Sequence, residues 1–385
     1  MPPPRPLFTP RFFVMCGFSF TVFISAFQLF PTAPFHIRDL GGSTFAAGLF
    51  LGLLTYASAC SAPFTGAFAD RIGHRRMLQI GSLAISGFSV AYALAPSPAV
   101  MLALVVPHGI FWSGLMVASG AYVTALVPEE RRAEGIGYWG LSTVLAIALA
   151  PNIGFLVYRR GWLLLCGVML ALNLIMAAIA WSLEELHRPA DPSEHRFTLE
   201  WRVLVVSLCV FLYSFGYGGV TSFSAMYAEA EGISPRAIYL TSVAAAILLS
   251  RPFAARLGDR FGYRRVFLPS MIVAGIGLAV LAVLPASRGA MIASAAVFGA
   301  GYGTAWPVFM AYMLGRVDSH RRGAAYGAMI AALDTGIGTG STALGWIIQQ
   351  YGYAAAFGFA AALSSLAVPY FLVADRAMRT VKSQS

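Results

Sequence analysis

The chain has 385 residues, of which 58% are hydrophobic and only 11% are charged. Soluble domains carry about 25% charged residues, so these charges are too few to cover a soluble globule of this length. The formal net charge of +10 is spread over short segments without a continuous basic face, which argues against a nucleic-acid-binding protein.

Long apolar blocks predict an all-α membrane protein with twelve transmembrane helices. Each block has roughly 20 to 27 residues, the length that a helix needs to cross about 30 Å of hydrocarbon. The blocks lack the alternating pattern of a membrane β-barrel. In chain order the predicted spans are residues 11–33, 44–68, 77–94, 99–126, 135–158, 162–183, 201–227, 238–257, 266–284, 289–314, 323–348 and 353–373.

The distribution of basic residues predicts the orientation of the chain. An even number of spans places both termini on one side, and most arginines fall in loops on that side. The positive-inside rule therefore predicts cytoplasmic termini in a multi-pass protein of the plasma (inner) membrane. The first block is too long for a cleaved signal peptide. The basic residues predicted on the opposite side are Arg38, Arg159, Arg160, Arg236 and Arg288.

The cysteines give no sign of a metal or cofactor site. All four fall within apolar spans, and their spacing is not that of metal ligands. We expect Cys16, Cys60, Cys166 and Cys209 to be small core residues, and we expect no cofactor.

An internal repeat predicts two similar halves. The segment "FTGAFADRIGHRRML" at residues 64–78 recurs as "FAARLGDRFGYRRVF" at residues 253–267, an offset of 189. Six spans per repeat predict two six-helix bundles of the same topology, related by a pseudo-twofold axis along the membrane normal. The predicted domains are residues 1–183 and 201–385, joined by a cytoplasmic linker at residues 184–200.

The repeated loop resembles a known signature. "GAFADRIGHRR" at residues 66–76 resembles the loop motif between the second and third helices of the major facilitator superfamily. In the second copy, Ala255 replaces the leading glycine. The resemblance covers the whole chain in span number, linker position and repeat, and it implies transport by alternating access.

We expect the loop motif to act in gating. Gly73 permits a tight turn that brings Arg75 back to the helix ends. Asp70 lies in the last turn of its helix, where the dipole disfavours a carboxylate unless a cation or another helix holds it. We expect Asp70 to bridge to the opposite half, with a solvated charge cluster as the alternative. The other gating candidates of the two loops are Arg71, Asp259 and Arg260.

The fifth span carries "ALAPNIG", which resembles the fifth-helix motif of proton-antiporting exporters in the superfamily. Pro151 bends the helix and Gly154 allows close contact with a neighbour, so both are gating candidates. Ala150 stands where a glycine is usual, and Phe155 follows Gly154 where a second glycine is expected. Packing alone is the alternative explanation of this pattern.

Two titratable residues inside spans are candidates for proton coupling. Asp334 lies about 17 Å into its span by helical rise, and desolvation there favours the protonated carboxyl group. A structural hydrogen bond or an ion pair with a cationic substrate are the alternatives for Asp334. His108 exchanges protons near neutral pH or forms a helix–helix hydrogen bond. Val105 stands where the superfamily's proton-coupled exporters usually have an arginine.

Arg251 interrupts the eighth span, where the first repeat has Ala62. Its side chain either extends to the cytoplasmic face near Arg256 or faces a cavity, where it pairs with Asp334 or an anionic substrate.

The resemblance implies that helices 1, 4, 7 and 10 surround a central cavity. Aromatic and polar side chains at suitable depth are the candidates for substrate binding, with a lipid-facing position as the alternative for each. Besides His108 and Arg251 they are Gln28, Trp112, Tyr213, Tyr217, Phe223, Tyr302 and Trp306.

The function expected from this resemblance is export of a small amphipathic molecule by proton antiport, as in the drug:proton antiporter and sugar-efflux-like branch. The alternatives are a proton-coupled importer of a sugar or organic acid and a membrane receptor or scaffold. Motifs of zinc hydrolases, serine hydrolases and P-loop nucleotide hydrolysis do not occur, so we expect no enzyme. The expected partners are a small-molecule substrate, protons and the lipid bilayer, with no nucleic acid, and we expect a monomer.

Overall fold

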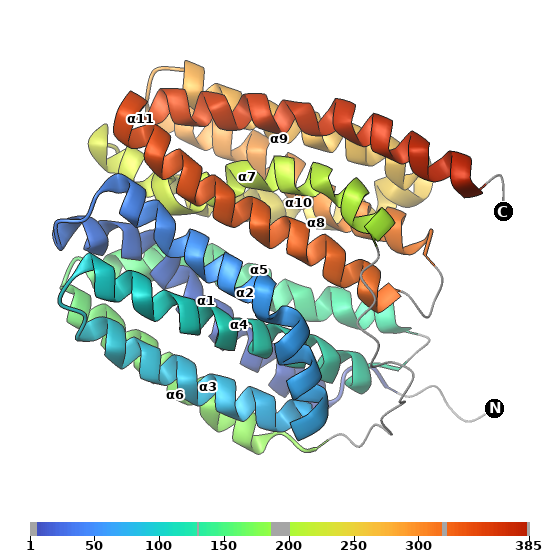
Figure 1. Cartoon of the computed structure of the whole chain (residues 1–385), viewed down its shortest axis with the longest axis horizontal. Coiled ribbons are helices and arrows are strands. Elements are labelled where there is room, and N and C mark those ends of the chain that lie inside the picture. The colour runs from blue at the N-terminus through green and yellow to red at the C-terminus, as the bar shows by residue number, and fades with distance from the viewer. Residues whose placement is uncertain (1–5, 129–130, 186–200, 318–321, 383–385) are drawn as a thin grey trace. The chain divides into compact units, whose positions relative to one another are not determined.

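The computed structural model describes residues 6–128, 131–185, 201–317 and 322–382, and these residues form helices and connecting loops without a strand. The first six helices are α1 (Pro10–Asp39), α2 (Thr44–Ile72), α3 (His74–Ala93), α4 (Pro98–Leu126), α5 (Arg132–Tyr158) and α6 (Trp162–Ser182). The others are α7 (Trp201–Ala230), α8 (Ile238–Phe261), α9 (Tyr263–Val283), α10 (Arg288–Leu314) and α11 (Arg322–Lys382) (Figure 1).

The element α11 consists of two helices that fold back on each other at Gly352, which has a φ of 81° (Figure 1). Each of the twelve predicted spans therefore has its helix. Eight elements are long and apolar enough to cross a membrane by length and composition. The prediction of an all-α membrane fold is confirmed.

Contacts between residues divide the chain into two compact units. Unit 1 comprises Met1–Thr32 and Cys60–Arg196, and unit 2 comprises Ala33–Ala59 and Phe197–Ser385. Unit 2 thus takes in the first part of α2. Most of the predicted linker lies outside the described residues, which resume at Trp201.

The repeat is visible in the backbone as well as in the sequence. The residues with positive φ among those described are all glycines, and they recur in pairs about 190 positions apart: Gly41 with Gly232, Gly73 with Gly262, and Gly161 with Gly352. Because only glycine adopts this conformation without strain, the two copies share their sharp turns. The predicted tight turn at Gly73, with a φ of 95°, is confirmed.

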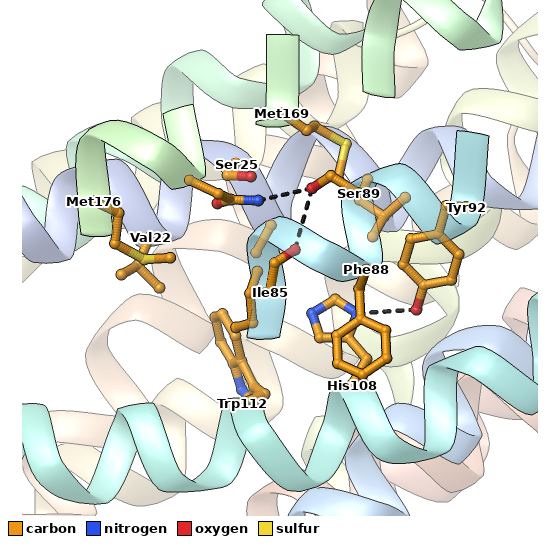
Figure 2. A pocket seen from close by; sticks show the side chains of 13 residues that line it. Val22, Ser25, Ile85, Phe88, Ser89, Tyr92, His108, Trp112, Met169 and Met176 are labelled. Carbon is orange, nitrogen blue, oxygen red and sulfur yellow. Dashed lines mark hydrogen bonds between the residues drawn. The ribbon is translucent and has the colours of Figure 1, made fainter. Parts of the chain in front are cut away.

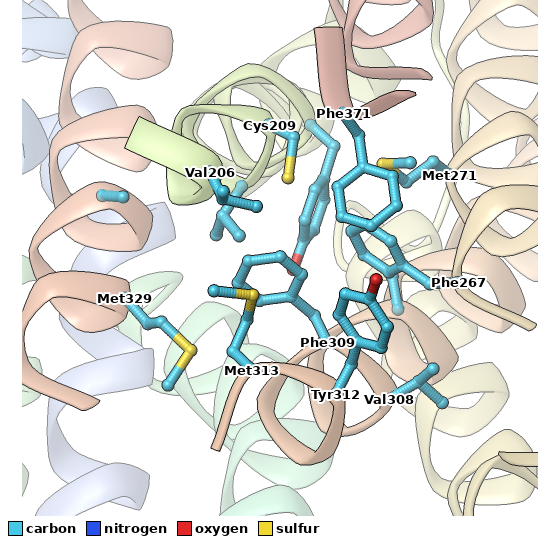
Figure 3. Packing of buried hydrophobic residues seen from close by; sticks show 14 of the residues in the cluster. Val206, Cys209, Phe267, Met271, Val308, Phe309, Tyr312, Met313, Met329 and Phe371 are labelled. Carbon is cyan, nitrogen blue, oxygen red and sulfur yellow. The ribbon is translucent and has the colours of Figure 1, made fainter. Parts of the chain in front are cut away.

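Each unit has its own core of buried aromatic and aliphatic side chains. In unit 2 the ring of Phe267 lies 5.0 Å from that of Phe309 and 4.9 Å from that of Phe371, measured between centroids. These rings come from α9, α10 and the second helix of α11, and Cys209 of α7 belongs to the same cluster (Figure 3). In unit 1, Phe18 of α1 and Tyr122 of α4 belong to the corresponding core.

Close backbone contact positions the first helix of α11 in unit 2. A Cβ atom at Gly218 of α7 would overlap the carbonyl oxygen of Ile337, and one at Gly340 would overlap that of Phe215. The Ser341 Oγ also donates to the Gly48 carbonyl oxygen of α2 at 2.8 Å. Without a hydrophobic driving force between helices in lipid, such packing and hydrogen bonds hold a bundle together. These contacts fix the position of the first helix of α11 and therefore of Asp334, which lies on it.

The prediction that all four cysteines are core residues is wrong for Cys60, which is exposed, and only partly right for Cys16, which is half-buried. Cys166 and Cys209 are buried as expected. The reason is that a membrane span is apolar on its lipid-facing side too, so composition does not distinguish the core from the surface. Phe64, with 76% of its surface exposed, shows the same ambiguity.

Candidate functional site

An aromatic cluster in unit 2 joins α7 to α10. The rings of Tyr217 and Tyr302 are stacked with centroids 4.5 Å apart and planes 6° from parallel. Phe298 stacks on Tyr302 at 5.5 Å, and Tyr213 meets Tyr302 edge-on at 5.5 Å. Tyr217 and Tyr302 are half-buried, whereas Phe298 and Tyr213 have no exposed surface. The cluster therefore presents two tyrosine rings on a buried aromatic support.

Arg251 lies beside this cluster. Its side chain, which is half-buried, is within electrostatic range of Tyr217 and Tyr302. Its Nε atom is buried, and it has no hydrogen-bond partner among the described residues.

Asp334 of α11 belongs to the same unit as Arg251. It is half-buried and within electrostatic range of Tyr302 and of Tyr326. The ion pairs formed among the described residues do not include Asp334 or Arg251. An Arg251–Asp334 ion pair, one of the alternatives that the sequence raised, is therefore not formed in this structure.

Three further candidates in unit 2 differ in accessibility. Trp306, one helical turn after Tyr302, is half-buried and packs against the unit 2 core. Tyr213 is fully buried, and its hydroxyl has no hydrogen-bond partner among the described residues. Phe223 is also fully buried, and the end of its ring lies close to Gly48 and Gly345. Packing accounts for the position of Phe223.

In unit 1, His108 lies on a small cavity (Figure 2). The Tyr92 hydroxyl and the His108 Nδ1 atom form a hydrogen bond of 2.9 Å, and the Phe88 ring stacks on the imidazole at 5.3 Å between centroids. Trp112 also lines the cavity. The cavity measures about 10 Å³, which is close to the space that one water molecule needs.

The cavity lining also includes uncharged polar side chains, among them Asn173 and Ser89. The buried Asn173 side chain donates from Nδ2 to the Ser89 Oγ at 2.9 Å (Figure 2). The Asn173 Oδ1 atom has no partner among the described residues. An imidazole and an amide thus face one water-sized space.

Gln28 and Gly154 meet where α5 crosses α1. Gln28 is fully buried; its Nε2 atom donates to the Ile24 carbonyl oxygen at 2.9 Å, and its Oε1 atom lacks a partner among the described residues. A Cβ atom at Gly154 would lie 3.0 Å from the Gln28 Cα atom. Pro151 lies within α5, three residues before this contact.

The two loop motifs have different surroundings. In unit 1, Arg75 donates to the Trp181 carbonyl oxygen at 3.0 Å, and His74 lies 3.8 Å from Asp70. In unit 2, the Tyr263 hydroxyl donates to Asp259 at 2.5 Å. Neighbouring charged residues stay near the surface: Arg71 is exposed, and the Arg260 guanidinium lies over the Phe261 ring at 5.2 Å.

Sequence reasoning missed a buried charge network at the end of unit 2. Asp375 has no exposed surface and accepts from Arg264 at 3.0 Å, from Arg316 at 3.2 Å and from the Tyr312 hydroxyl. Arg316 also lies over the Tyr312 ring at 4.0 Å. The available signal was the repeat, which pairs Asp375 with Glu185 and Tyr312 with Tyr122 at an offset of 190.

The chain resembles known transporters in sequence and in fold. The family model described as Major Facilitator Superfamily matches residues 12–247 and 206–385. An uncharacterized MFS-type transporter of Burkholderia mallei is 27% identical over 96% of this chain and 93% of its own length. A similar transporter of Salmonella typhimurium is 26% identical over 88% of both chains.

Solved structures share the fold at low sequence identity. A bacterial homologue of the human lysosomal transporter Spinster, in an inward-facing and occupied conformation, has a TM-score of 0.79 and 15% identity, over 95% of this chain and 96% of its own. The nucleoside transporter NupG has a TM-score of 0.77 and 13% identity, over 95% of this chain and 99% of its own.

Proposed function

Because the chain belongs to the Major Facilitator Superfamily, and is therefore a multi-pass membrane transporter, we propose that it exports a small amphipathic molecule in exchange for protons. The observation that carries the proton coupling is Asp334, an acidic side chain within a long apolar helix that forms no ion pair among the described residues. A charged group inside a membrane costs several kcal/mol unless it is solvated or paired. Asp334 is thus suited to carry a proton.

The proposed cycle has the substrate and the proton competing at Asp334. The deprotonated carboxylate favours substrate binding from the cytoplasm, and a proton that enters from outside favours release outward. The two predicted bundles, residues 1–183 and 201–385, tilt about this site. The partial exporter motif around Pro151 and Gly154 supports the outward direction, and the repeated loops around Asp70 and Asp259 act as the cytoplasmic gate.

His108 is the second proposed proton carrier. Its hydrogen bond to Tyr92 fixes the orientation of the ring, and the adjoining cavity has the size of a water molecule. Asn173, on the same cavity, is an acceptor for such a water. We also propose that both termini are cytoplasmic, as the basic loops favour, and that the protein works as a monomer.

The test is proton movement in vesicles that contain the purified full-length protein. A pH-sensitive dye inside the vesicles reports proton flux when amphipathic probes, such as ethidium and naphthylalanine, are added across an imposed pH gradient. We expect substrate-dependent proton flux with the wild type and its loss with Asp334→Asn. Glu231→Gln is the control, because Glu231 is an exposed acidic residue in a loop of the same unit.

If Asp334→Asn kept the full substrate-dependent proton flux, Asp334 would not be the residue that couples proton movement to transport. The direction of transport is measured separately in cells: an exporter lowers the accumulation of its substrate when expressed, whereas the alternative function, proton-coupled import of a sugar or organic acid, raises it.

A further inference from the structure

Unit 2 contains two opposite charges that are not paired with each other. Arg251 is a permanent cation within α8, and Asp334 is an acid within α11. Neither belongs to an ion pair among the described residues. Elsewhere in the same unit, buried Asp375 is paired with both Arg264 and Arg316. The contrast matters because unpaired charges inside a membrane are costly, so a group from outside the chain is the natural partner.

Tyr302 is the described residue that is influenced electrostatically by both charges. It is within range of both Arg251 and Asp334, whereas Arg251 itself is in range of Tyr217 and Tyr302. A tyrosine hydroxyl can donate and accept hydrogen bonds, but it does not neutralise a charge. The chain therefore holds a cationic and an anionic group near one tyrosine without an ion pair between them.

The aromatic cluster supplies the third feature of this arrangement. The half-buried rings of Tyr217 and Tyr302 are nearly parallel, and Trp306 follows one turn later on α10. Such rings bind planar apolar groups by stacking. Both charges are within electrostatic range of Tyr302, one of the stacked rings, so stacking and charge recognition belong to the same region of unit 2.

Unit 1 keeps the aromatic geometry without the charges. At the repeat positions of Tyr213 and Tyr302 it has Phe23 and Trp112, which meet at 5.6 Å and 68°, against 5.5 Å and 69° in unit 2. The position of Arg251 is occupied by Ala62, and that of Asp334 by Val144. The scaffold of the repeat thus forms in unit 1 without either charge.

We propose that the transported substrate is a planar zwitterion whose anionic group binds Arg251 and whose cationic group binds Asp334. This inference rests on the proposed function. It also gives the exchange a chemical basis, because the cationic group of the substrate and a proton occupy the same carboxylate in turn. A purely anionic substrate would instead favour a protonated Asp334 and move together with the proton.

The experiment uses four probes that share one ring system. Naphthylalanine is a zwitterion, its methyl ester is a cation, its N-acetyl derivative is an anion, and its N-acetyl methyl ester is neutral. Binding to the purified full-length protein is measured by calorimetry, with thermal stabilisation as a second readout. We expect the wild type to bind the zwitterion about 10- to 100-fold more tightly than either singly charged probe, the range for one charged hydrogen bond.

Two variants separate the two charges. With Arg251→Gln, the zwitterion and the methyl ester should bind equally, because the carboxylate has lost its partner. With Asp334→Asn, the zwitterion and the N-acetyl derivative should bind equally. Arg256→Gln is the matched control, since this exposed arginine lies on the same helix. Arg251→Lys keeps the positive charge, so it should bind the zwitterion more tightly than the methyl ester, but by a smaller factor than the wild type. This variant tests the same contact if Arg251→Gln fails to fold.

Several results would overturn the inference. They are failure of all four probes to bind, equal binding of the neutral probe and the zwitterion, and wild-type preferences that persist in both variants. A short-chain phosphatidylethanolamine that binds more tightly than naphthylalanine would also overturn it, because this zwitterionic lipid has no planar group to stack.

The proposed function is judged independently. Preference for the methyl ester alone, with flux that still depends on Asp334, would leave proton antiport intact and assign a cationic substrate. The zwitterion pattern together with unchanged flux in Asp334→Asn would support the site and contradict the proposed coupling.

Discussion

The polar groups inside the two units differ more than their folds do. In unit 1, His108, Tyr92, Asn173 and Ser89 form short hydrogen bonds around a water-sized cavity, and none of them carries a permanent charge. In unit 2, the repeat position of His108 is occupied by Phe298, and the polar groups within the helices include the charged residues Arg251 and Asp334. The duplicated backbone, with its paired glycine turns, thus supports two different kinds of chemistry.

The surroundings of the equivalent residues Tyr122 of α4 and Tyr312 of α10 also differ between the units. Tyr122 of unit 1 donates to the backbone carbonyl oxygen of Glu184 at 2.8 Å. Its repeat equivalent, Tyr312, donates to the buried Asp375 side chain together with two arginines. Unit 2 therefore depends on a carboxylate where unit 1 uses the main chain, and this predicts unequal sensitivity to substitution.

The largest effect is expected from Asp375→Asn. The substitution removes the charge that Arg264 and Arg316 share, and breaking a buried pair costs about 3 kcal/mol or more. The melting temperature of the purified protein measures it. Glu184→Gln is the control in unit 1, because its ion pair with Arg11 is exposed at both side chains and should contribute less than about 1 kcal/mol. Equal decreases in melting temperature in the two variants would contradict the expected difference between the units.

Gly218→Ala should destabilise the protein by about 1 to 3 kcal/mol through overpacking. The added methyl group overlaps the backbone of Ile337, which cannot move aside as a side chain could. Gly120→Ala is the matched helical control, with no atom within 4 Å of the added Cβ. The repeat places Gln28 at the position of Gly218, and in unit 1 the glycine of the corresponding contact lies on the other helix, as Gly154 of α5. An unchanged melting temperature would contradict the α7–α11 packing.

His108→Phe gives unit 1 the residue that unit 2 has at the same repeat position, Phe298. It leaves the buried Tyr92 hydroxyl without its His108 partner, at a cost of about 1 to 2 kcal/mol. Adding Tyr92→Phe should restore much of the melting temperature, because both polar partners are then gone. If His108 carries protons, the double variant stays deficient in pH-driven flux. Recovery of both stability and flux would assign His108 a structural role alone.

The smallest effects should come from Ser97→Ala and Ser287→Ala, and they should be alike. These residues cap α4 and α10 by accepting from the backbone of Val100 at 3.4 Å and of Ala290 at 3.1 Å. Loss of a helix cap costs about 1 kcal/mol. Thermal melting of the two variants in the same detergent tests the equivalence, which a difference of several degrees would contradict.

Much of the fold was predictable because it depends on local patterns. Span length, the tandem repeat and the turn at Gly73 follow from hydropathy, self-similarity and the freedom of glycine. The candidate site was predictable in part. Arg251 and Asp334 stood out as charges in apolar spans, but neither the stacking of Tyr217 on Tyr302 nor the burial of Phe223 left a signal in the sequence.

Sequence alone was sufficient for the membrane class, the twelve helices and the two-fold duplication, because each is written in residues close together along the chain. Tertiary structure was needed to decide which charges are paired. Asp375 of α11 and Arg264 of α9 meet in one network with Arg316, which lies in the turn after α10, whereas Arg251 and Asp334 remain separate. Pairing depends on how helices rotate and approach each other, and contacts between distant segments set that geometry.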